Sequence, residues 1–127
     1  MAVTLTTAAR DAACNAIVDL VDGGAGAGTL VFEDGSDTEI ATLTFTDPAF
    51  GASSTGVATA SAIADDTTAT GGTTVQASFF DSDSTKVLEC SVTASGGGGD
   101  ITLAGGTTIG ANATVSVSSL TVTVPAT

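Results

Sequence analysis

Carboxylates are the residues of this chain that could do chemistry, and one group of them stands in the stretch FFDSDSTK. There Asp81 and Asp83 precede the hydroxyls of Ser84 and Thr85, which resembles the start of a calcium-binding loop. The glycine and the distal glutamate of an EF-hand loop are missing, and the stretch lies between two predicted strands rather than between helices. We therefore interpret it as a polar hairpin turn and predict no metal site.

A second group is the adjacent pair Asp65 and Asp66. Paired carboxylates hydrolyse glycosides when they flank the scissile bond. Such sites are clefts lined with aromatic side chains, and the chain contains neither Trp nor Tyr. We interpret the pair as solvated loop residues.

The chain lacks the residues that other common catalytic and binding sites require. The chain contains no histidine, which excludes Ser-His-Asp and Cys-His arrangements. Its two cysteines, Cys14 and Cys90, are too few for a structural zinc site, and we expect buried thiols rather than a disulfide. The glycine runs GGAGAG and SGGGG lack the Lys-Ser/Thr of a phosphate-binding loop and are interpreted as linkers. The sequence therefore predicts no catalytic, cofactor-binding or metal-binding residue, and a protein that is not an enzyme.

The charge balance restricts the partners. Arg10 and Lys86 stand against fourteen acidic residues, which gives a net charge of −12 at pH 7. Binding to nucleic acid or to an anionic membrane needs clustered basic residues, so we predict neither. A cationic partner, a role in solubility and a salty medium all remain open. No segment approaches the about 20 apolar residues of a membrane span, and the first residues do not resemble a secretory signal, so we expect a protein made in a cytoplasm.

One helix is predicted, over residues 6–22, with Thr6 or Thr7 as its N-cap and Gly23-Gly24 at its end. Its apolar residues recur at helical spacing: Ala9, Ala13, Ala16, Ile17 and Leu20. Polar residues occupy another face: Asp11, Asn15, Asp19 and Asp22. We expect the apolar stripe to pack on the domain's own sheet, with docking on a partner as the alternative, and the polar face to meet the solvent.

Alternating apolar and polar residues predict strands over most of the remaining chain. The predicted strands are 29–34, 40–46, 55–63, 73–80, 86–94, 101–106 and 113–126. In the last one Val115 and Val117 are out of phase with Leu120, Val122 and Val124, which predicts a bulge or a corner at Ser118-Ser119. Phe50, after the Asp47-Pro48 stop, is expected to fold back onto the core.

These elements predict a mainly β fold: an antiparallel β-sandwich, jelly-roll-like, with one N-terminal α-helix, in a single domain over residues 1–127.

Several stretches, in order along the chain, resemble a group of small virion proteins of tailed bacteriophages. They are LTTAARDAA, IVDLVDGGAGAGTL, ATLTFTDPAFG, GVATASAI, FFDSDSTKVLECSV and VSVSSLTVTVPA. The TAARDAA start and the DPAFG corner are the more specific of them. The chain departs from the group at the hairpin, where ASFF and DSDST stand in place of basic or Trp residues and an Asp-Gly turn.

The resemblance implies a capsid decoration (cement) protein with a jelly-roll-like fold. Such a protein would bind the major capsid protein on the outside of the shell as a homo-oligomer, with a trimer favoured. It would be made in the host cytoplasm and reside on the capsid surface of the virion. The alternatives are a component of the tail or of the head-to-tail connection, and an adhesion module on the particle surface.

Overall fold

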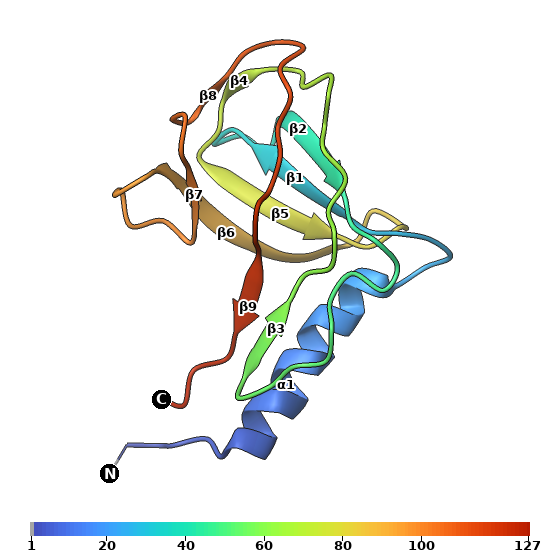
Figure 1. Ribbon diagram of the computed structural model, residues 1–127, viewed down its shortest axis with the longest axis vertical. Coiled ribbons are helices and arrows are strands. Elements are labelled where there is room, and N and C mark those ends of the chain that lie inside the picture. Colours follow the sequence, from blue (N-terminus) through green and yellow to red (C-terminus); the bar gives the residue numbers. More distant parts are fainter. Residues whose placement is uncertain (1) are drawn as a thin grey trace.

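A curled five-stranded sheet, one helix and an irregular second layer make up the fold, which the computed structural model describes for residues 2–127 (Figure 1). The protein is therefore mainly β with one N-terminal helix, as the sequence predicts. The elements in chain order are α1 (Thr7–Asp19), the 3-10 turn η1 (Leu20–Asp22), β1 (Thr29–Glu33), β2 (Glu39–Thr44), β3 (Val57–Thr59), β4 (Gly72–Thr73), β5 (Gln76–Phe80), β6 (Lys86–Ala94), β7 (Ile101–Leu103), β8 (Thr108–Ile109) and β9 (Thr121–Thr123).

The sheet has the strand order β2-β1-β5-β6-β7 and mixed strand directions. The first four strands are antiparallel, but β7 runs parallel to β6, with Val92 paired to Ile101 and Ala94 to Leu103. The prediction of a fully antiparallel sheet was therefore wrong. Parallel neighbours usually need a connection of a dozen residues or more, whereas here the chain returns within the loop 95–100.

Glycines make this short return possible. A Cβ atom on Gly97 would lie 2.7 Å from the Cβ of Thr93, and one on Gly99 would lie 2.9 Å from the Thr93 Cγ2, so the loop lies flat against β6. Asp100 then fixes the start of β7, because its Oδ2 accepts hydrogen bonds from the N–H of Ser91 (2.9 Å) and from its hydroxyl (2.7 Å). The SGGGG run is thus packed at Gly97 and Gly99, where its interpretation as a flexible linker was wrong, whereas a Cβ atom on Gly96 or Gly98 would meet no atom within 4 Å.

The GGAGAG run is also packed rather than free. It lies against the β5–β6 turn, where the Ser82 hydroxyl donates to the Gly23 carbonyl (3.0 Å) and accepts from the Gly26 N–H (3.2 Å). A Cβ atom at Gly28 would lie 2.4 Å from the carbonyl oxygen of Phe80. Only glycine allows this close approach, so the second linker interpretation was wrong for the same reason.

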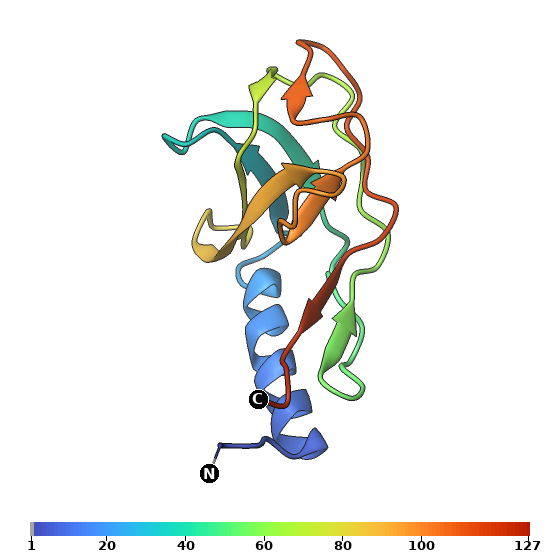
Figure 2. The ribbon, with the colours of Figure 1, turned by 90° about the vertical axis from the view of Figure 1, so that its left-hand side faces the viewer.

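A second layer faces the concave side of the sheet (Figure 2). In it β3 pairs with β9, Asp66 pairs with Val115, and Ala64 pairs with Thr44 of β2. From Thr59 to Asp66 the chain advances seven positions while its partner, from Thr121 back to Val115, advances six. The ladder therefore breaks between the two pairs, and the chain bends at Ser118, which confirms the predicted interruption at Ser118-Ser119.

This layer is less regular than the sequence predicts. The strands expected over 55–63 and 113–126 are reduced to β3 and β9 with isolated bridges, and the small β4–β8 pair was not predicted as such. The structure is therefore a curled mixed sheet with an irregular cover, and it does not by itself establish a sandwich or a jelly roll.

Apolar residues from both layers and from the helix form one core. Phe50 is 6% exposed and its ring lies 5.6 Å from that of Phe45 and 6.3 Å from that of Phe79, centroid to centroid. The prediction that Phe50 folds back onto the core is thus confirmed. Ring pairs at these distances stabilise the core beyond the burial of their area.

The helix α1 begins as predicted but ends at Asp19, three residues early, and the 3-10 turn η1 covers the rest of the predicted helix up to Gly23; α1 also turns a different face to the domain. Thr6 is the N-cap, and its hydroxyl accepts from the Ala9 N–H at 3.2 Å. The helix packs against β3 and β9, so packing on the chain's own domain is confirmed. The buried residues are Cys14 and Val18 of α1 and Val21 of η1, whereas Ala9, Ala16 and Leu20 of the predicted stripe are exposed.

The predicted polar face of α1 is the reason for this rotation. Asn15 accepts from the N–H of Ser53 (2.8 Å), and Asp22 accepts from the N–H of Ala49 (2.7 Å). Asp11 accepts from the Ser53 hydroxyl (2.9 Å) and from the Gly56 N–H (2.7 Å). Since the loop 49–56 has backbone donors that need partners, these side chains turn toward it, and only Asp19 of the four meets the solvent as predicted.

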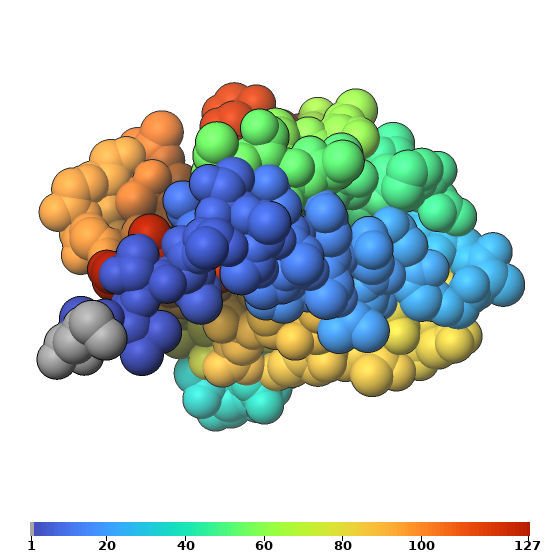
Figure 3. All heavy atoms as spheres, turned by 90° about the horizontal axis from the view of Figure 1, so that it is seen from below, coloured from blue at the N-terminus to red at the C-terminus, as the bar shows by residue number. Residues whose placement is uncertain are grey.

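The exposed side of α1 crosses the lower face of the molecule (Figure 3). Within residues 2–127 no helix is long and apolar enough to cross a membrane.

Candidate functional site

The Asp81–Thr85 stretch forms the polar turn that the sequence predicts. Asp81 Oδ1 accepts from the N–H of Asp83 (3.0 Å) and from that of Thr85 (2.8 Å), so this carboxylate closes the turn. The β1–β2 turn repeats the pattern, with Asp34 Oδ1 accepting from Ser36 (2.8 Å) and Thr38 (3.0 Å). These two N–H groups hold the pKa of Asp34 below its usual value. Both acids have a structural task in their turns.

Asp66 also has a structural task, and its interpretation as a solvated residue was wrong. Its Oδ2 accepts from the N–H of Thr42 on the outer edge of β2 (2.8 Å), and its Oδ1 accepts from the N–H of Thr68 (2.9 Å). Asp66 therefore fastens the second layer to one edge of the sheet. Its neighbour Asp65 is exposed, as predicted.

An acidic cluster that sequence reasoning missed lies on the outer face of the sheet. Carboxylate oxygens of Glu33, Asp37 and Glu89 lie within 4.8 Å of one another. Glu33 is 4% exposed and accepts from the Ser78 hydroxyl at 2.8 Å. The signal for this cluster was the pairing of β1, β5 and β6, which places Glu33 opposite Gln76 and Ser78 opposite Glu89.

Lys86 supplies the positive charge of this cluster. Its Nζ lies 2.7 Å from Glu89, 3.9 Å from Glu33 and 4.0 Å from Asp37. The hydrogen bond to Glu89, together with the other carboxylates, raises the pKa of Lys86. Oxygen ligands of this kind suit a hard cation such as Ca²⁺, but the ammonium group already balances part of their charge, and the arrangement functions as an ion-pair network.

The two cysteines are separate thiols, as the sequence predicts. Cys14 is fully buried, and its Sγ lies 3.4 Å from the carbonyl oxygen of Val122. Burial, with smaller contributions from Asp100 and Glu89, raises the pKa of Cys90 to about 11. A thiol with so high a pKa is a weak nucleophile at neutral pH.

A surface without charge is the most distinctive feature of the molecule. No charged residue occurs after Asp100, so residues 101–127 are neutral in a chain that carries sixteen charged residues before them. We call the surface of residues 101–127 the neutral face. It includes β7, β8, β9 and the segment that runs down over the sheet in Figure 1.

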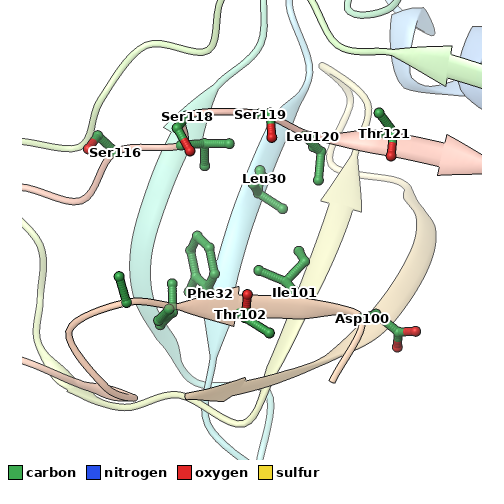
Figure 4. Close-up of a pocket in the computed structure, with 13 residues that line it drawn as sticks. Leu30, Phe32, Asp100, Ile101, Thr102, Ser116, Ser118, Ser119, Leu120 and Thr121 are labelled. Atoms are coloured by element: carbon green, nitrogen blue, oxygen red, sulfur yellow. The ribbon is translucent and has the colours of Figure 1, made fainter. Parts of the chain in front are cut away.

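The neutral face contains an opening between two of its own segments. We call the segments Ile101–Leu103 and Ser116–Thr121, with the space between them, the seam (Figure 4). A hollow of about 370 Å³ lies there, above the buried residues Leu30 and Phe32. Ile101 and Leu120 point into it and are half-buried, while serine and threonine side chains and Asp100 stand around it.

The backbone along one side of the seam is unpaired. Within residues 2–127, the N–H and C=O groups of Ser116, Val117, Ser118 and Ser119 form no hydrogen bond to protein. On the other side β7 is the edge strand of the sheet. Asp66 and Ala64 close the curled sheet at its β2 edge, and the seam is where it stays open at its β7 edge. Open strand edges beside apolar residues are sites at which further strands add.

No protein family, curated protein or solved structure matches the chain.

Proposed function

We propose that this protein is a structural virion protein of a tailed phage, which decorates and stabilises the outside of the capsid as a cement protein. Its partner in this proposal is the major capsid protein, and it performs no catalysis. The curled sheet and its irregular cover would then be a reduced jelly-roll-like sandwich. The assignment to a phage particle depends on the resemblance of the sequence stretches, and the proposed docking depends on the neutral face.

The neutral face is the observation that carries the mode of action. Seven of the acids have internal tasks: Asp11, Asp22 and Asp66 hold loops, Asp34 and Asp81 close turns, and Glu33 and Glu89 bind Lys86. A chain of net charge −12 repels other acidic surfaces over most of its area. Close docking on many equivalent positions is therefore favoured where charge is absent, over residues 101–127.

A component of the tail or of the head-to-tail connection is the second candidate, because a neutral face would serve a ring equally well. An adhesion module on the particle is the third. Binding to the head and binding to the tail can be distinguished by testing which of the two isolated particles retains the protein.

Co-sedimentation of the purified protein with shells that lack it, and separately with isolated tails, tests the proposal. We expect saturable binding to shells that persists at high salt, because neutral surfaces are not screened. Thr114→Asp, which places a charge on an exposed position of the neutral face, should weaken binding. Ser36→Asp, which adds the same charge to the exposed β1–β2 turn, is the matched control and should bind normally. Binding only to tails, or binding lost at moderate salt, would contradict the proposal.

A further inference from the structure

The first residues of the described chain form an exposed apolar arm. Ala2–Leu5 precede the helix cap, and their alternation places Val3 and Leu5 on one side and Thr4 on the other. Val3 is 80% exposed and Leu5 is 38% exposed. Within residues 2–127 the arm makes one backbone hydrogen bond, from the Leu5 N–H to the Ala126 carbonyl (2.8 Å). An extended segment with one apolar side and free backbone groups is suited to strand addition.

The seam has the complementary features. Ser116–Ser119 offer four residues of unpaired backbone, the same number as the arm, so that each spans about 13 Å at roughly 3.3 Å per residue. Half-buried Ile101 and Leu120 offer apolar contact to side chains that alternate along an added strand.

The charge distribution favours a second copy of this chain as the partner that binds at the seam. Two copies of a chain with net charge −12 repel each other except where both surfaces are neutral. Residues 2–9 carry no charge, and among the residues that line the hollow of the seam Asp100 is the only charged one, with its carboxylate already bonded to Ser91. The arm and the seam are therefore a matched pair of surfaces through which a second copy can approach.

We propose that the arm of one copy adds as a strand to the seam of the next copy. The added strand pairs with the free backbone of Ser116–Ser119 and closes the sheet at its β7 edge. Two copies can exchange arms reciprocally about a two-fold axis, or successive copies can join head-to-tail, which closes into a ring when the rotation between copies allows it. The inference concerns contact between copies and does not depend on the capsid as the partner.

Hydrogen exchange of the Ser116–Ser119 amides in the purified protein tests this proposal, measured in dilute and in concentrated solution. We expect about tenfold slower exchange in concentrated solution, because the exchange rate follows the fraction of open seams. Size-exclusion chromatography with light scattering, on the same samples, should show a mass that rises with concentration.

Two arm variants separate the effect of losing an apolar side chain from the effect of adding a charge to the arm. Val3→Asp should abolish the concentration-dependent protection, whereas Thr4→Asp adds the same charge to the opposite side and should retain it. Both residues are exposed, so the thermal midpoint should be unchanged in each variant.

Three results would overturn the proposal. One is exchange at these amides that does not depend on concentration, and another is protection that survives Val3→Asp. The third is protection that appears only when shells are added, which would assign the seam to a strand of the shell protein.

Discussion

Removal of the Asp66 carboxylate should detach the second layer from the sheet. Asp66→Ala leaves the N–H groups of Thr42 and Thr68 without their acceptor, at distances of 2.8 and 2.9 Å in the native protein. Hydrogen bonds to a charged acceptor contribute about 1.5 to 3 kcal/mol each, and the site is part-buried, so we expect a loss of about 2 to 4 kcal/mol in the free energy of unfolding. For a chain of 127 residues this corresponds to a thermal midpoint lower by about 7 to 15 °C.

Asp65→Ala is the matched control, since it removes the same charge from the adjacent, exposed position. Substitutions of this kind usually change stability by less than about 0.5 kcal/mol. Urea unfolding followed by circular dichroism, with both variants and the native protein at one pH, gives the comparison. Equal stability of the two variants would refute the view that Asp66 holds the layers together, and would leave only a change in net charge.

Three further predictions follow from single contacts. Gly97→Ala should destabilise the protein by about 1 to 3 kcal/mol, because the added Cβ atom would lie 2.7 Å from Thr93. The control is Gly105→Ala, whose added Cβ atom would meet no atom within 4 Å and should be tolerated. Thermal unfolding of both variants checks this. The hydrogen bonds from Ser91 depress the pKa of Asp100 in the folded protein. The stabilisation that they give is therefore present above the unfolded pKa of about 3.9 and is lost as the pH falls through the folded pKa. Asp100→Asn should make the urea midpoint less sensitive to acid, and an unchanged sensitivity would contradict this. Cys14 and Cys90 should react with a thiol reagent at pH 7 only after unfolding, because one is fully buried and the pKa of the other is raised to about 11; a fast reaction in the native state would disprove it.

Local patterns predicted the elements that depend on local sequence. The alternation in KVLECSVTA gave β6 its observed bounds, Lys86–Ala94, and Thr6 caps the helix as its position indicates. The face of α1 was misread because alanine carries little hydrophobic signal, while Asp11 and Asn15 bond to a loop some 40 residues away in the sequence. That partner is visible only in three dimensions.

Long-range pairing explains the other differences. The parallel direction of β7 depends on glycines that lie flat on Thr93, and nothing in the spacing of SGGGGD distinguishes such a loop from a free linker. Asp65 and Asp66 are alike in sequence, and only the position of Thr42 separates their roles. The neutral face was available from the sequence, because no charge follows Asp100, but the seam within it requires the pairing of the strands.

Electron cryo-microscopy of purified virions would show where this chain lies on the particle and which of its surfaces is covered. We expect repeated copies on the outside of the capsid, with residues 101–127 in contact with shell protein or with a neighbouring copy. Particles without this chain would contradict the proposal. Copies that contact the shell through the β1–β2 and β5–β6 turns, while the neutral face meets the solvent, would also contradict it.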